Sequence, residues 1–242
     1  MFDKRQYAIL TERYFETLLG DLATLAWMVG QAPLIAGLII LRWRTLQATD
    51  TLYFVIALSA VWFGCINACR EIAKESEIYK RERIFGIDPA AYLASKVKIL
   101  GLVGLVEVFI FYFLLERYLS MDLSMPPAFT ALYGLYFSGM ATGLMLSRWC
   151  GTTGRAVVAV PIVIIPQIVF SKFVLPENTL KGAAETIEKL MVVKWGFEAI
   201  GHSKQGEVAV GDFMTAMVVL IGLGVVFLIA TLFHLRFGGE DI

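Results

Sequence analysis

The sequence predicts an all-α membrane protein in which six transmembrane helices follow an amphipathic helix at the membrane interface. Hydrophobic residues make up 58% of the 242 residues, well above the share in a soluble domain. Apolar stretches of membrane-spanning length, about 20 residues, recur six times along the chain. No stretch shows the ten-residue alternation of a membrane β-barrel, so helices must satisfy the backbone hydrogen bonds within lipid.

Residues 1–20 contain the predicted interfacial helix. Tyr7, Leu10, Tyr14 and Leu18 share one helical face, and most of the charged residues lie elsewhere. This pattern is typical of a helix lying in the membrane interface, although an ordinary cytoplasmic cap helix would show it too.

Residues 21–242 form the predicted six-span domain. Segments 51–69 and 213–233 contain no charged residue, and the third and fifth spans are interrupted by a few charges. We predict spans at about 22–41, 51–69, 97–119, 128–147, 156–175 and 213–235.

Six spans place both termini on one side of the membrane. That side receives 13 of the 21 Lys and Arg residues and the opposite side receives 8, which predicts cytoplasmic termini. Arg42 and Arg44 favour the reverse orientation for the first hairpin. The formal net charge is zero and no basic face is evident, so nucleic acid is not an expected partner.

The most highly charged segment, residues 70–96, separates the second and third spans. Its helix should end near Phe85 and Gly86, where glycine suits a helix C-terminus. Asp88 and Pro89 then fit the N-cap and first position of another helix. We predict two short helices joined by a sharp turn, suited to binding a cytoplasmic partner.

A second long connection, residues 175–212, precedes the last span. Its apolar periodicity predicts an amphipathic outer helix over 176–201 that returns toward the outer leaflet.

Catalytic and metal-binding motifs are missing from the sequence. There is no nucleotide-binding P-loop, and His202 and His234 have no spacing that suits a metal site. Gly139 and Gly143 match a small-xxx-small packing pattern that only weakly suggests a dimer face. We expect no catalytic residue and no metal.

Two polar residues within the spans need an explanation. Glu107 is a functional candidate because ionisable groups in a span are costly, and a proton-coupled carrier centred on it is one hypothesis. The alternative is a structural bond to a serine, an asparagine or the backbone. Asn67 is expected to tie two helices together.

The charged segment also resembles a known family. Glu75-Ser-Glu-Ile-Tyr-Lys-Arg-Glu82-Arg-Ile-Phe-Gly86, followed by Ala91-Tyr-Leu-Ala-Ser-Lys96, is similar to the coupling segment of ABCG (White-type) permeases in the ABC-2 superfamily. Phe170-Ser171 and Val193-Lys-Trp-Gly-Phe-Glu-Ala-Ile200 resemble further elements of that family. Bacterial permeases that pair with separate ATPase subunits look nearest.

The resemblance implies an ABCG-like (type V) exporter fold in the bacterial inner (cytoplasmic) membrane. Two six-span protomers, as a homodimer, would enclose a path, and an ABC ATPase subunit would bind beneath each. This chain would bind no cofactor, because ATP and Mg would sit in the partner. The cargo would be hydrophobic or amphiphilic, with a lipid-like molecule as one candidate, and would move out of the cytoplasm or inner leaflet. Exported polysaccharide or peptide is the alternative, because other ABC-2 relatives carry them.

Site residues also follow from the resemblance. Phe63, Ile165 and Ile168 would line the cargo path, and Phe173 and Val174 would form the outer gate, where Lys172 replaces the family's usual glycine. Residues 76–90 would act as the coupling helix, with Glu75 and Glu82 in a polar relay beneath the bundle. The predicted ATPase-coupling residues are Glu75, Glu77, Tyr79, Lys80, Arg81, Glu82, Arg83, Phe85 and Gly86.

A different class of function fits the same charged segment. The chain would then be a membrane anchor or scaffold that uses this segment only to recruit a cytoplasmic protein.

Overall fold

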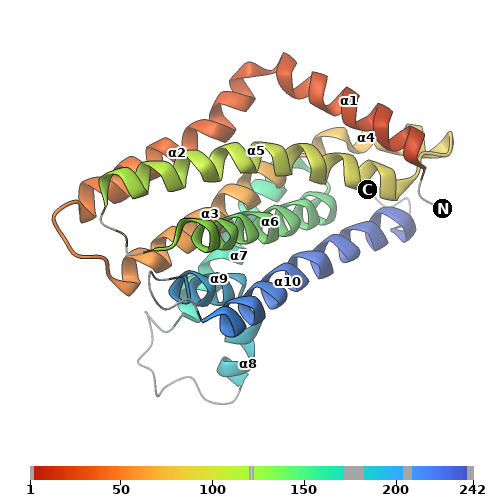
Figure 1. Cartoon of the computed structure of the whole chain (residues 1–242). Helices are drawn as coiled ribbons and strands as arrows, with labels where there is room; N and C mark the ends of the chain where they lie inside the picture. Colours follow the sequence, from red (N-terminus) through yellow and green to blue (C-terminus); the bar gives the residue numbers. More distant parts are fainter. Residues whose placement is uncertain (1–2, 120, 122, 172–182, 204–208, 239–242) are drawn as a thin grey trace.

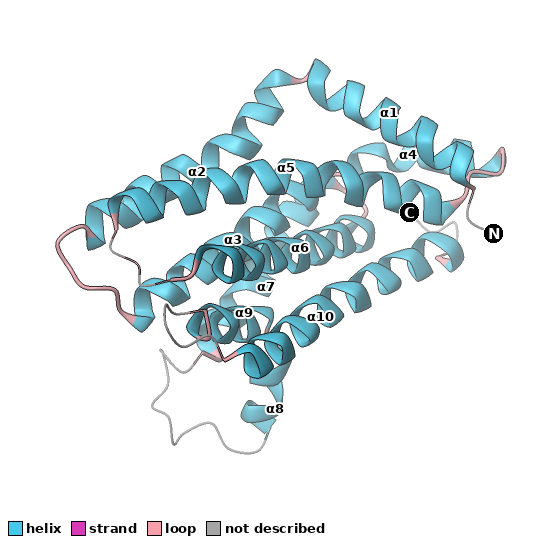
Figure 2. Cartoon of the chain, in the orientation of Figure 1, coloured by secondary structure: helices cyan, strands magenta, loops and turns pink. Residues whose placement is uncertain are grey.

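The computed structural model describes residues 3–119, 121, 123–171, 183–203 and 209–238. Within these ranges the structure is helical and has no strand, which confirms the predicted all-α fold (Figure 2). The helices are α1 (Lys4–Gly20), α2 (Leu22–Trp43), α3 (Asp50–Ala68), the 3₁₀ turn η1 (Ala73–Glu75), α4 (Ser76–Ile84), α5 (Pro89–Tyr118), α6 (Met125–Cys150), α7 (Thr153–Val169), α8 (Ala183–Leu190), α9 (Val192–Gly201) and α10 (Val210–Phe237).

Five segments among the described residues are long and apolar enough to cross a membrane: α2, the run from α3 into α4, α5, α6 and α10. Helix α7 is apolar but has only 17 residues, which is the lower end of the usual range for a span. The predicted fifth span continues to residue 175, and its last four residues lie outside the described part. A sixth span therefore stays a prediction.

Helix ends follow local sequence signals. Asp3 caps α1 by accepting hydrogen bonds from the amides of Arg5 and Gln6, at 2.9 and 3.1 Å. Asp88 caps α5 by accepting from the amide of Ala90 at 3.1 Å, and Pro89 occupies the first helical position. Both arrangements satisfy first-turn N–H groups that lack partners within the helix.

The bundle has two different ends (Figure 1). Helices α1 and α4, the first turns of α5 and the end of α10 gather at the right of the view, and α8 and α9 lie away from that end. Helix α6 runs through the centre, where it packs against α3, α5, α7, α9 and α10.

Close contact between α3 and α6 depends on glycine. A Cβ added to Gly64 would lie 2.1 Å from the carbonyl oxygen of Tyr136 on α6. A Cβ added to Gly139 or Gly143 on α6 would lie 2.3 Å from the carbonyl oxygen of Val61 or 2.4 Å from that of Cys65, respectively. The small-residue pattern of α6 therefore serves packing within one chain.

Two expectations about the connections are corrected. Residues 90–96 are not a separate short helix, because after Asp88 and Pro89 nothing interrupts the helix until Tyr118. The outer helix is not continuous either: Met191 is extended and separates α8 from α9, and residues 176–182 lie outside the described part. The amide of Val193 in the first turn of α9 donates to Gln167 Oε1 on α7 at 3.0 Å, which fixes where α9 begins.

Candidate functional site

The turn after α4 carries large apolar side chains that are exposed. Ile84 is 83% exposed and Phe85 is 90% exposed. Gly86 has a φ of +86°, in the left-handed region that favours glycine, so it reverses the chain toward α5. Neighbouring exposed apolar side chains on a rigid turn indicate a surface for another molecule.

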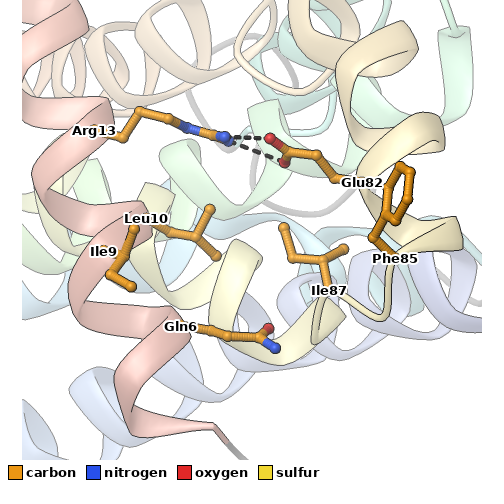
Figure 3. A pocket seen from close by; sticks show the side chains of 7 residues that line it. All are labelled: Gln6, Ile9, Leu10, Arg13, Glu82, Phe85 and Ile87. Carbon is orange, nitrogen blue, oxygen red and sulfur yellow. Dashed lines mark hydrogen bonds and ion pairs between the residues drawn. The ribbon is translucent and has the colours of Figure 1, made fainter.

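One side of α4 is bound to α1. The guanidinium of Arg13 donates two hydrogen bonds to the Glu82 carboxylate, one of them at 3.2 Å (Figure 3). The Gln6 side chain accepts from the amide of Asp88 at 2.7 Å and donates to the carbonyl of Gly86 at 3.3 Å. Between the helices lies a hollow of about 250 Å³ lined by Gln6, Ile9, Leu10, Arg13, Glu82, Phe85 and Ile87.

Glu82 also changes the acid–base behaviour of its partner. Its hydrogen bond raises the pKa of Arg13 above the usual value for arginine, against the opposing effect of partial burial. Two parallel hydrogen bonds between a guanidinium and a carboxylate form only in a narrow range of orientations. The Arg13–Glu82 contact therefore sets the orientation of α4 relative to α1.

The other side of α4 is bound to the end of α10. The Tyr79 hydroxyl donates to the carbonyl of Leu235 at 3.3 Å. Arg83 donates to the carbonyls of Leu235 and Arg236. The last carbonyls of a helix have no partner within it, so these two side chains of α4 satisfy part of the C-terminus of α10.

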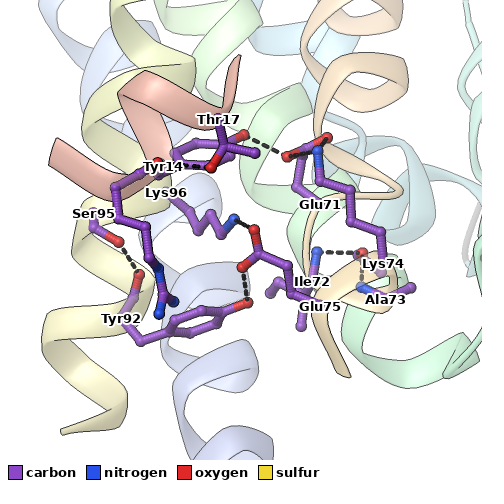
Figure 4. A network of polar contacts seen from close by, with 12 residues as sticks. Tyr14, Thr17, Glu71, Ile72, Ala73, Lys74, Glu75, Tyr92, Ser95 and Lys96 are labelled. Carbon is purple, nitrogen blue, oxygen red and sulfur yellow. Dashed lines mark hydrogen bonds and ion pairs between the residues drawn. The ribbon is translucent and has the colours of Figure 1, made fainter. Parts of the chain in front are cut away.

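A buried polar network lies between α1, η1 and α5 (Figure 4). The Tyr14 hydroxyl donates to Glu71 at 2.5 Å, and Lys74 donates to the same carboxylate at 2.8 Å. Burial, followed by the charge of Glu71, raises the pKa of Tyr14 well above its ordinary value. The phenol therefore stays protonated and keeps donating its hydrogen bond.

A second part of this network centres on Glu75. Its carboxylate forms an ion pair with Lys96 at 2.6 Å and accepts from the Tyr92 hydroxyl at 3.1 Å. Lys96 is almost fully buried, and its amine lies 3.5 Å from the centroid of the Tyr14 ring. The cation–π contact joins the two parts of the network.

Polar residues in the spans form a separate cluster. Asn67 accepts from Gln31 on α2 at 2.8 Å and donates to Glu107 on α5 at 2.7 Å. This confirms that Asn67 ties helices together and that Glu107 is bonded to an asparagine. In the part of the chain that the structure describes, no basic side chain forms an ion pair with Glu107.

Replacing Asn67 by alanine is expected to lower the free energy of unfolding by about 1 kcal/mol, since interhelical hydrogen bonds in membrane proteins contribute modestly. Thermal unfolding of the detergent-solubilised protein measures the change. Ser59→Ala is the matched control, because the Ser59 hydroxyl bonds only to the Val55 carbonyl of its own helix. Equal effects of the two substitutions would contradict the assignment.

The residues predicted for a cargo path lie in different environments. Phe63 is fully buried within the bundle, where its ring meets that of Phe111 edge-on with centroids 5.0 Å apart. Ile165 is 55% exposed on α7 and Ile168 is half-buried there. Phe173 and Val174, the predicted gate, lie outside the described residues. These assignments stay predictions.

The predicted coupling residues are placed by the structure in three ways. Glu75, Tyr79, Glu82 and Arg83 make the contacts with α1, α5 and α10 given above. Phe85 and Gly86 form the exposed turn. The remaining three, Glu77, Lys80 and Arg81, lie on the outward side of α4, with Lys80 bonded to Glu77 at 2.9 Å.

Several partners were not foreseen from the sequence. Tyr14 was predicted only as part of the apolar face of an amphipathic helix, no partner was predicted for Arg13 or Gln6, and no contact was predicted for the end of α10. The one available clue was the position of Arg13 and Gln6 off the apolar face of the first helix.

Comparisons with known proteins agree with this architecture. No curated protein sequence matches the chain. The family profile described as ABC-2 type transporter matches residues 5–203, a range that includes α1, the charged turn and the network around Glu75. The chain therefore belongs to the ABC-2 type transporter family and is an integral membrane transport protein.

Proposed function

We propose that the chain is the permease subunit of an ABC exporter, driven by ATP that a separate partner subunit hydrolyses with Mg. Both termini face the cytoplasm of a bacterial inner membrane. The observation that carries the proposal is the position of α4: its apolar turn is exposed, and its two sides are hydrogen-bonded to α1 and to α10. Such an element suits an ATPase subunit that docks on the turn.

The contacts of α4 provide a route for mechanical work. A displacement of the turn acts on α1 through Glu82 and on the end of α10 through Arg83. It also acts on α3, because only η1 and a short turn separate α4 from α3. Rigid elements joined by polar contacts can exchange one packing arrangement for another when a partner changes shape.

An exposed apolar face on α7 supports a path between two protomers. Val158, Ile162 and Ile165 are 67%, 67% and 55% exposed and follow each other at helical spacing. A second copy of the chain facing this surface would form a homodimer with an apolar path. We propose a hydrophobic or amphiphilic, lipid-like cargo on that basis. Phe63 is fully buried within one protomer, so it would reach such a path only after the helices around it rearrange.

Co-purification tests the proposal. The tagged full-length chain is purified from its native membrane in mild detergent, and the preparation is assayed for ATP hydrolysis and for its protein subunits. An ATPase subunit is expected in the complex. A bound partner without ATPase activity would support the scaffold hypothesis instead.

The double substitution Ile84→Asp and Phe85→Asp is expected to reduce ATPase retention at least tenfold. Central apolar anchors of an interface cost about 2 kcal/mol each when lost. The permease itself should keep its unfolding temperature, because both side chains are exposed. Leu46→Asp, at an exposed apolar residue outside α4, is the matched control. Unchanged retention in the double variant would refute docking at this turn.

Arg83→Ala is expected to leave the ATPase bound but to lower ATP hydrolysis by the complex severalfold. The substitution removes the hydrogen bonds that Arg83 donates to the carbonyls of Leu235 and Arg236, keeps the bond from Tyr79 to Leu235, and leaves the apolar turn intact. Arg83→Lys keeps the positive charge but lacks the planar guanidinium that reaches two carbonyls. This variant therefore shows whether coupling needs the charge alone or both hydrogen bonds. If the alanine variant hydrolyses ATP normally, the contact of Arg83 with α10 does not take part in coupling.

A further inference from the structure

Two adjoining hollows form a groove along α5, bordered by α10 at the first hollow and by α6 at the second. The first has a volume of about 380 Å³ and is lined by Tyr7, Leu93, Val97, Lys98, Leu228 and Leu232, among others. The second has a volume of about 260 Å³ and includes Val97, Lys98, Leu102, Leu105, Tyr133 and Phe137. Val97 and Lys98 belong to both, so the two hollows adjoin, and α6 contributes Tyr133 and Phe137 to the second.

The groove is apolar except at one point. Lys98 is exposed, and of the described residues that line either hollow it is the one that carries a charge. The ion pairs found within the described ranges do not include Lys98. An exposed ammonium within a membrane-spanning helix requires a polar or anionic partner.

The position of the Lys98 amine points to the lipid headgroup region. It lies 5.5 Å from the centroid of the Tyr7 ring on α1, the amphipathic helix. A lysine near the end of a span extends its amine toward the interface while its alkyl stem stays in apolar surroundings. Tyrosine is itself enriched at that depth.

The length of the groove suits an acyl chain. On the membrane side of Lys98 its α5 side runs to Leu105, which corresponds to a rise of about 10 Å at 1.5 Å per residue. One leaflet of the hydrocarbon core is about 15 Å thick. A lipid whose phosphate lies at Lys98 would therefore place its chains along the leucines of the groove, within one leaflet.

We propose that this groove is a binding site for an anionic phospholipid, with the headgroup phosphate at Lys98 and the acyl chains along α5 beside α6. Assignment of the site to the cytoplasmic leaflet rests on the orientation proposed above. The charge complementarity is with the lipid phosphate and its anionic headgroup. An uncharged or zwitterionic lipid fills the apolar part but gains less from the lysine.

Photocrosslinking of the full chain tests the site. The protein is reconstituted in phosphatidylcholine nanodiscs that contain a small fraction of phosphatidylglycerol with a diazirine in its acyl chain. Adducts are expected in residues 98–105 of α5 and 133–140 of α6. Excess unlabelled phosphatidylglycerol should compete, and neither phosphatidylcholine nor free inorganic phosphate should do so.

Lys98→Ala is expected to reduce the yield of these adducts about fivefold. One basic residue near an anionic membrane surface strengthens binding by about this factor. Lys98→Arg should retain the adducts, and Lys80→Ala, at a lysine outside the groove, should have no effect. Equal labelling of wild type and Lys98→Ala would overturn the proposal. So would equal competition by phosphatidylcholine, or crosslinks from the groove to a second copy of the chain. The assay contains no ATPase, so its outcome is independent of the proposed exporter function.

Discussion

Gly64→Ala is expected to lower the free energy of unfolding by about 3 kcal/mol or more, at the upper end of the range for overpacking. The new methyl group would lie 2.1 Å from the carbonyl oxygen of Tyr136 and 2.6 Å from the amide nitrogen of Met140. Both atoms belong to the backbone of α6, so no side chain can rotate away and the helices must separate. Thermal unfolding and the monodisperse fraction after solubilisation measure the effect.

Gly222→Ala is the matched control for this prediction. Gly222 lies within α10, and outside the backbone of that helix no atom is within 4 Å of the place that a Cβ would take. Alanine has the higher helix propensity, so this variant should be as stable as the wild type or slightly more stable. A Gly64→Ala protein that unfolds at the same temperature as Gly222→Ala would show that α3 and α6 are not in tight contact.

Lys96→Met is expected to destabilise the protein by about 3 kcal/mol, because it leaves the Glu75 carboxylate without its cation beneath the bundle. The lysine side chain is 2% exposed and that of Glu75 is 16% exposed, so water replaces little of the lost interaction. The Tyr92 hydroxyl remains as a donor but carries no charge. Chemical or thermal unfolding of the purified chain gives the change.

Two further variants show whether the charge pair is responsible. Glu75→Gln combined with Lys96→Met removes both charges and should recover much of the lost stability, since replacing a buried pair as a whole is often nearly neutral. Lys189→Met breaks the exposed pair with Glu185 and should change stability far less than Lys96→Met, because water screens an exposed pair. If the double variant is as unstable as Lys96→Met, packing of the lysine stem, not its charge, accounts for the loss.

Much of the fold could be predicted from the sequence because its signals are local. Apolar stretches of spanning length define helices wherever lipid replaces water, since the backbone must satisfy its own hydrogen bonds. The turn at Phe85 and Gly86 and the start of α5 at Asp88 and Pro89 were predicted from residue types with narrow conformational preferences. The break between α8 and α9 in the outer connection was not predicted. The first turn of α9 is held by a hydrogen bond to Gln167 on α7, a helix distant in the sequence.

The candidate site was only partly predictable for the same reason. The charged segment by itself predicted a binding surface for a cytoplasmic partner, through its composition and its glycine turn. Tertiary structure decided that Glu82 faces Arg13, that Arg83 reaches the last carbonyls of α10, and that Lys96 lies buried beside Glu75. These contacts join residues far apart in the chain, and their geometry depends on how the helices pack, which side-chain spacing within one helix does not encode.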